Sequence, residues 1–126
     1  MRRSLSSAYY ILELARLGDA IVNYIFSACF TLFLKKPSGV RAKNSILRRV
    51  FKESKIADVF GVKRLPSGVE PEDFIEAVVA LLWLEGKINV EKAVEYIVHV
   101  DEESISGDLE YLVADRLIKY ILSMKK

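Results

Sequence analysis

The sequence has 126 residues, a hydrophobic content of 52% and a formal net charge of +2. This length predicts a single domain, residues 1–126, that is large enough to bury a core. The only cysteine, Cys29, excludes an internal disulfide, so a cytoplasmic protein is expected. The only histidine, His99, leaves little room for a zinc site or a histidine-based triad.

Apolar residues recur at helical spacing along the chain, and Gly and Pro separate the helical stretches. Residues 4–34 are predicted to form one long helix or two in tandem, ended by Pro37 and Gly39. Further helices are predicted at 42–53, 54–61, 71–86 and 89–100, with a last helix and a basic tail within 101–126.

Two residues mark predicted helix starts. Pro71 suits a first helical position, and Asn89 is a predicted N-cap. The Val- and Ile-rich stretch EYIVHV is predicted to be helical as well, because no hairpin turn signal separates candidate strands around it. The sequence therefore predicts an all-α fold.

The apolar run 20–34 is shorter than the ~20 apolar residues that a membrane-spanning helix needs. Three polar residues also interrupt it: Asn23, Ser27 and Thr31. At the N-terminus, Glu13 and Arg16 break the apolar stretch that a signal peptide would require. No membrane partner is expected.

Charge is distributed unevenly along the chain. Residues 35–64 contain ten Lys or Arg and two acids, a net charge of +8, whereas the remaining residues carry −6. Such a basic segment could neutralise a polyanion such as a nucleic acid. The alternative is a solvated helix face that is merely rich in cations.

The stretch LARLGDAIVNYIF, residues 14–26, places Gly18 and Asp19 inside an apolar helix. Glycine costs about 1 kcal/mol relative to alanine in a helix interior and is tolerated where another helix must come close. An ionised carboxylate in a crowded region needs a cation or hydrogen-bond donors, and a divalent metal is one such partner. The alternative is an exposed Asp19 at a break in the helix.

A second acidic pair lies in EPEDFIEAVVALLWLEG. Asp73 and Glu76 are three residues apart and so share one face of the helix that Pro71 opens. Glu72 and Asp73 also suit a first turn, where acids complement the helix dipole, but Glu76 is surrounded by apolar residues. Together with Asp19, these oxygen donors suit magnesium or manganese.

Both stretches resemble the ribonuclease III family. LARLGDAIVNYIF is similar to the signature helix, which reads roughly E-x-L-E-F-L-G-D-A-V-L, and DFIEAVVALLWLEG is similar to the later D-x-x-E-A-L-I-G-A-I-x-L-D helix. The order agrees, and the match runs from about residue 12 to residue 100. The resemblance is closest to small archaeal ribonuclease III-like proteins and to Mini-ribonuclease III, which have no separate double-stranded-RNA-binding domain.

The resemblance implies a dimeric helical bundle that hydrolyses phosphodiesters in double-stranded RNA with Mg²⁺ or Mn²⁺. Asp19 matches the signature aspartate, while Asp73 and Glu76 match the later aspartate and glutamate; these three would be the catalytic residues and metal ligands. The signature's two glutamates, seven and four residues before the aspartate, are here Leu12 and Ala15. The candidates to replace the missing acid are Glu13 and Glu72.

On this reading, cations of the basic segment hold RNA phosphates, with Asn44 contacting a sugar or a base edge. The predicted RNA-binding residues are Lys43, Asn44, Arg48, Arg49 and Lys52. A duplex is bound mainly through its shape, phosphates and 2′-hydroxyls, so little sequence specificity is expected.

The signature helix is apolar on more than one face, so part of it is predicted to pack against a second subunit. The expected homodimer interface comprises Ile21, Val22, Ile25 and Phe26.

Two alternatives to a nuclease remain open. One is a catalytically silent RNA-binding or ribonucleoprotein structural protein with the same fold, which Ala15 favours. The other is a helical protein-interaction module with no RNA role.

Overall fold

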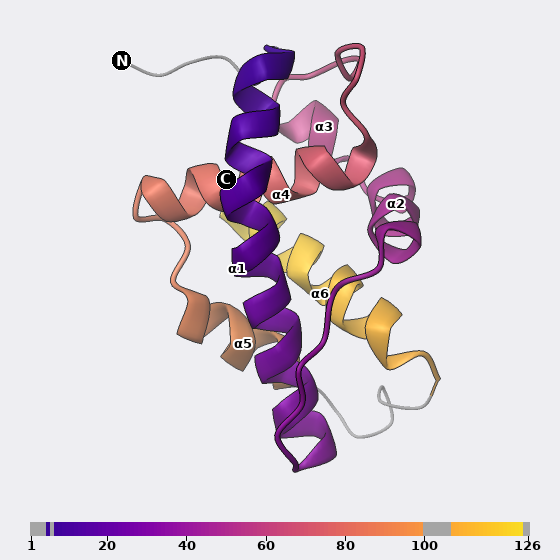
Figure 1. Cartoon of the computed structure of the whole chain (residues 1–126), viewed down its shortest axis with the longest axis vertical. Helices are drawn as coiled ribbons and strands as arrows, with labels where there is room; N and C mark the ends of the chain where they lie inside the picture. Colours follow the sequence, from indigo (N-terminus) through magenta and orange to yellow (C-terminus); the bar gives the residue numbers. More distant parts are fainter. Residues whose placement is uncertain (1–4, 6, 100–106, 125–126) are drawn as a thin grey trace.

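The computed structural model describes residue 5 and residues 7–99 and 107–124. Within them the chain is all-helical, as predicted, and contains no strand. The elements are α1 (Ala8–Leu34), α2 (Asn44–Glu53), α3 (Ile56–Val59), α4 (Pro71–Leu84), α5 (Val90–Val98) and α6 (Leu109–Ser123). Figure 1 shows the long α1 crossing α4, with α5 and α6 beside the lower half of α1.

The predicted helix boundaries hold with small shifts. Helix α1 is one continuous helix, capped by Ser7, and it ends at Lys35 in the left-handed conformation, before Pro37 is reached. The predicted start at Ser4 lies outside the described residues. Pro71 opens α4, and the Asn89 side chain accepts a hydrogen bond from the backbone N–H of Lys92, so both predicted helix starts are confirmed.

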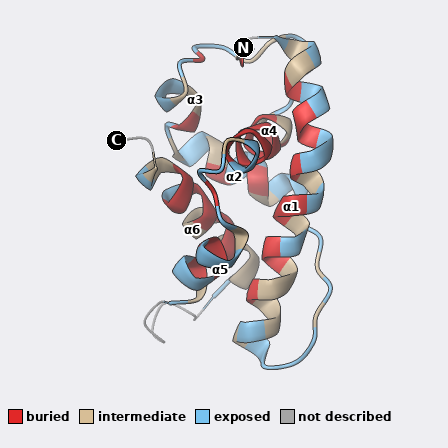
Figure 2. Cartoon of the chain, turned by 90° about the vertical axis from the view of Figure 1, so that its left-hand side faces the viewer, coloured by how far each residue is buried: buried red, intermediate tan, exposed pale blue. Residues whose placement is uncertain are grey.

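Helix α4 is the centre of the core. Every residue from Phe74 to Leu82 is buried, so helices cover it on nearly all sides, as Figure 2 shows. Its closest neighbour is α1, and at the crossing Gly18 faces the backbone of Glu76. A Cβ atom built on Gly18 would lie 1.8 Å from the Glu76 carbonyl oxygen. Gly18 therefore permits close helix approach, as predicted.

A polar edge of α1 binds the segment that connects it to α2. We define this edge as Asp19, Asn23, Ser27 and Thr31, spaced four residues apart, and the segment as residues 35–43. Ser27 Oγ accepts from the Val40 N–H at 2.8 Å, Thr31 Oγ1 from the Ser38 N–H at 2.9 Å and Asn23 Oδ1 from the Ala42 N–H at 2.8 Å. These hydrogen bonds explain the polar residues inside the apolar run of α1.

One helix of the described chain, α1, is long and apolar enough to cross a membrane by length and composition. At 27 residues the whole helix exceeds the ~20 that a span needs, whereas the sequence argument considered only the apolar run 20–34 inside it. The core helix of a soluble protein and a signal sequence have the same properties, and one side of α1 packs against α4 and α5. The expected absence of a membrane partner therefore stays a prediction.

Candidate active site

The three predicted acids lie around one surface hollow. Asp19 of α1 and Asp73 and Glu76 of α4 line a hollow of about 450 Å³, together with Leu12, Ala15 and Arg16. The α1–α4 crossing at Gly18 creates this arrangement, because it places the two helix faces that carry the acids next to each other.

Glu76 is the acid with the most perturbed environment. The residue is only 8% exposed, and burial, the neighbouring Asp19 carboxyl and the charges of Asp73 and Glu72 raise its pKa to about 8. A carboxyl with that pKa is mostly protonated at neutral pH unless a cation joins it. A cation bound in this environment has a large effect on the protonation of the carboxyl group.

Asp19 and Asp73 each have other partners. An Arg41 guanidinium nitrogen lies 3.3 Å from Asp19 Oδ2, and Asn23 Nδ2 donates to Asp19 Oδ1 at 3.3 Å. Asp73 Oδ2 accepts from the Glu70 N–H at 2.9 Å, as half of a capping box at the start of α4. In the part of the chain that the structure describes, no three His, Cys, Asp or Glu residues are grouped so that they could hold a metal ion.

The donor set nevertheless fits Mg²⁺ or Mn²⁺. These ions favour oxygen ligands, and Mg²⁺ commonly keeps several waters while one or two protein carboxylates hold it. Asp19 and Glu76 could supply two such carboxylates, and a cation beside them would offset the burial and the repulsion that raise the pKa of Glu76. Asp73 is the acid whose capping bond would have to change for direct ligation.

Neither candidate to replace the missing signature acid lies at the hollow. Ala15 does line it, so the lost carboxylate belongs to this site. Glu72 instead forms a two-bond ion pair with Arg48, at 2.8 Å from Nε and 3.0 Å from Nη2, and this pairing lowers its pKa. Glu13 does not line the hollow, whereas Arg16, which the sequence reasoning missed, does. Its spacing of three residues before Asp19 is the signal that could have found it.

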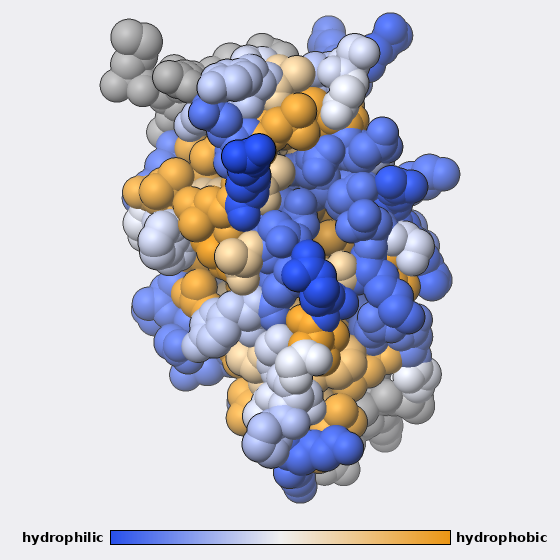
Figure 3. All heavy atoms as spheres, viewed as in Figure 1, coloured by the Kyte–Doolittle hydropathy of each residue, from blue (hydrophilic) through white to orange (hydrophobic). Residues whose placement is uncertain are grey.

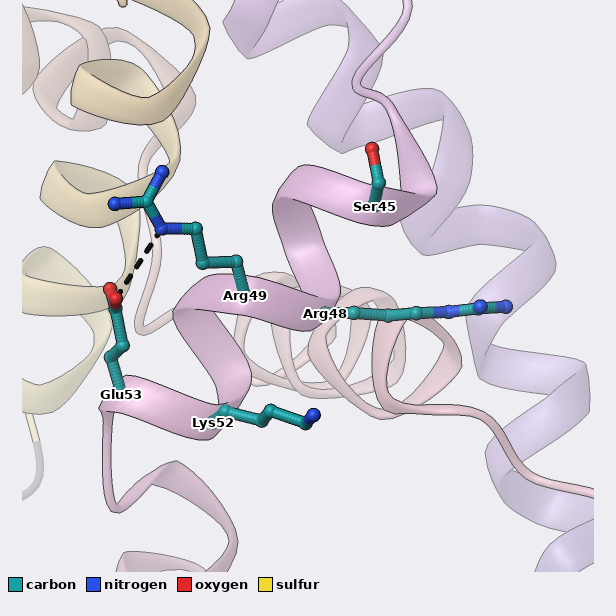
Figure 4. A pocket seen from close by; sticks show the side chains of 5 residues that line it. All are labelled: Ser45, Arg48, Arg49, Lys52 and Glu53. Carbon is teal, nitrogen blue, oxygen red and sulfur yellow. Dashed lines mark hydrogen bonds and ion pairs between the residues drawn. The ribbon is translucent and has the colours of Figure 1, made fainter.

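The predicted RNA-binding residues lie at the start of α2 and on its exposed surface. Arg48, Arg49 and Lys52 line a hollow of about 410 Å³ with Ser45 and Glu53, and Figure 4 shows Arg48 and Arg49 pointing to opposite sides of the helix. This hollow lies on a face of α2 and is separate from the one lined by the acids.

Most of these cations already have acidic partners. Lys43 Nζ lies 3.2 Å from Glu110 Oε1, and Arg48 binds Glu72. Arg49 Nε lies 3.4 Å from Glu53 Oε2, and the Arg49 Cζ atom lies 4.0 Å from the centroid of the Tyr111 ring. Asn44 is exposed at the start of α2, and Lys52 is exposed with no ion pair to any described residue. The +8 segment is thus partly neutralised by acids from other helices.

The predicted dimer residues require a correction. Ile21 is 9% exposed and Val22, Ile25 and Phe26 are 0% exposed, because all four pack in the chain's own core. Side chains buried this way cannot form an intersubunit surface. The exposed large apolar residues of α1 and of the end of α4 are different ones: Tyr9, Leu12, Leu17, Tyr24, Leu32, Leu34, Trp83 and Leu84. Apolar surface is visible beside α1 in Figure 3.

A family model described as Ribonuclease III matches residues 12–123, which include both helices that line the acidic hollow. No curated protein sequence matches the chain.

Proposed function

We propose that this chain, which belongs to the ribonuclease III family, is a metal-dependent endoribonuclease that hydrolyses phosphodiester bonds in double-stranded RNA. Family membership supports an RNA-processing role. The observation that carries the catalytic part is the buried Glu76 beside Asp19 in a hollow lined by three carboxyl groups.

Asp19 and Glu76 would hold the metal ion, with Asp73 next to them in the hollow. When bound, Mg²⁺ or Mn²⁺ supplies orientation and activation of a water and stabilises charge on the phosphate and the leaving oxygen. Glu76 must lose its proton to serve as a ligand, so metal binding should release a proton near neutral pH. No side-chain nucleophile is needed.

RNA would bind across the face of α2, where Lys52 and the exposed Asn44 are free to approach it. Lys43, Arg48 and Arg49 can contribute only by sharing or exchanging their acidic partners. Arg48 is the least suited to that exchange, because its removal from Glu72 would leave a buried carboxylate without a cation.

The proposal is tested with full-length protein and long duplex RNA. In Mn²⁺ the wild type is expected to cut the duplex, in EDTA it is expected only to bind, and log affinity should fall linearly with log salt. Asp19→Asn keeps the shape of the side chain but removes its charge, and it should reduce cleavage by roughly 100-fold or more while leaving binding in place.

The outcomes separate the alternatives. Salt-dependent binding without cleavage in any metal would support a silent RNA-binding protein, which Ala15 and the capping bond of Asp73 favour. Absence of binding even at low salt would leave a protein-interaction module. Full activity of Asp19→Asn would disprove the site even if the wild type were a nuclease.

We also propose a homodimer, now built on the exposed apolar residues of α1 and the end of α4. Leu32 and Leu84 are 54% and 57% exposed, and contact surfaces between chains are commonly built from exposed apolar side chains. Light scattering at micromolar concentration is expected to give the mass of two chains. Leu32→Glu should shift it to one chain without loss of helicity. A one-chain mass for the wild type would contradict the dimer.

A further inference from the structure

In the described part of the chain, Arg41 is the cation that forms an ion pair with an acid of the hollow. One of its terminal nitrogens lies 3.3 Å from Asp19 Oδ2 and 3.5 Å from Oδ1, although the two residues are 22 positions apart. The Arg41 side chain is 78% exposed. The guanidinium therefore touches Asp19 with one nitrogen while most of its N–H groups face solvent.

The backbone on both sides of Arg41 is fixed to the polar edge of α1. The Val40 N–H donates to Ser27 and the Ala42 N–H to Asn23, each at 2.8 Å. Asn23 in turn donates to Asp19. An exposed ion pair ordinarily contributes little to stability, because ordering two side chains costs entropy. Here the backbone position of Arg41 is set in advance, which favours a role for the charge beyond folding.

The charge of the hollow leaves room for such a role. Ala15 stands where the family signature has a glutamate, so the hollow, which Arg16 also lines, has one carboxylate fewer to balance divalent metal. A guanidinium brings a single positive charge and needs no further carboxylate. Its planar N–H groups match the geometry of phosphate oxygens. A carboxylate also has enough lone pairs to bind Arg41 and a metal ion together.

We propose that Arg41 acts in this site beside the metal ion, binding a phosphate oxygen of the RNA at the scissile position while Asp19 holds it in place. This rests on the proposed nuclease function. Ser27 is then a positioning residue, because it acts on the phosphate only through the backbone beside Arg41, whereas Asn23 also contacts Asp19 directly.

The experiment compares Arg41→Gln with Lys36→Gln, which removes a charge from an exposed residue of the same 35–43 segment. Duplex cleavage is measured at saturating Mn²⁺, and Mn²⁺ affinity is measured without RNA from the free-ion EPR signal. Arg41→Gln should lower the cleavage rate roughly 100-fold with Mn²⁺ binding at least as tight as in the wild type, because a competing positive charge is gone. Arg41→Lys should be intermediate, and Lys36→Gln should match the wild type.

Two results would overturn the role of Arg41. Unchanged cleavage in Arg41→Gln would show that the guanidinium does not contact the reacting phosphate. Weaker Mn²⁺ binding, in proportion to the loss of cleavage, would show that Arg41 only orders Asp19. If the wild type itself cleaves no duplex, the nuclease function fails and the role of Arg41 fails with it, a result that is visible before any variant is compared.

Discussion

Gly18→Ala is expected to destabilise the protein more than any other single methyl addition to α1. The new Cβ would lie 1.8, 2.4 and 2.9 Å from the carbonyl oxygen, carbonyl carbon and Cα of Glu76. All three atoms are backbone, so no side-chain rotation can relieve the clash. Helices α1 and α4 would have to move apart, and their contact is the most extensive in the fold.

The size of the effect follows from two opposing terms. Alanine gains about 1 kcal/mol in helix propensity over glycine, whereas overpacking a core typically costs 1–3 kcal/mol and sometimes more. With backbone on both sides of the clash we expect the upper end, a net loss of at least about 2 kcal/mol. The free energy of unfolding would be measured by urea denaturation.

Gly39→Ala is the matched control. A Cβ at Gly39 would meet no heavy atom within 4 Å, so its stability should stay within about 0.5 kcal/mol of the wild type. Gly18→Ala should also separate Asp19 from Glu76 and thereby remove the stabilising effect of Mn²⁺. A Gly18→Ala protein as stable as Gly39→Ala would disprove the close crossing of α1 and α4.

Glu76→Gln is expected to abolish cleavage and yet to stabilise the metal-free protein at alkaline pH. The pKa of Glu76 is about 8 in the folded chain, against an ordinary value of 4.5. Between these values the folded state binds more protons than the unfolded state, so the stability of the wild type falls as pH rises through this window. Glutamine does not titrate, and the variant should therefore gain relative to the wild type up to about pH 8, with the gain constant above that.

Bound metal should reverse the order of the melting temperatures of the wild type and Glu76→Gln. A ligand that binds only the folded state stabilises it by mass action, so Mn²⁺ should raise the melting temperature of the wild type and have much less effect on Glu76→Gln. Melting temperatures from pH 5 to pH 9, with and without Mn²⁺, test both parts.

Glu13→Gln serves as the control, because Glu13 is on α1 but does not line the hollow. It should cleave normally and respond to Mn²⁺ as the wild type does. Cleavage that survives Glu76→Gln would refute the assignment of Glu76, and a metal-free stability difference that does not vary with pH would refute the raised pKa.

The sequence by itself determined the helical class, the helix starts at Pro71 and Asn89 and the three acids of the hollow. Pro71 and Asn89 act through local backbone chemistry, so their effect is readable without the rest of the fold. Gly18 was also readable, because a glycine inside an apolar helix implies a close neighbour. The family motif then paired that helix with the one that carries Asp73 and Glu76.

Only the tertiary structure decided which partner each side chain has. Helical periodicity tells which residues share a face, but it does not tell which element covers that face. Ile21 and its apolar neighbours were therefore assigned to a second subunit, although α1 buries them in its own core.

The same limit applies to charges. Arg48 looked available to RNA until Glu72, 24 positions away, was brought to 2.8 Å from it. Asp73 looked like a ready metal ligand, yet it caps its own helix. Arg41 could not be placed beside Asp19 at all, because the contact depends on the path of the 35–43 segment along α1. Ion pairs act over a few ångströms in space, and only packing brings residues so distant in sequence that close.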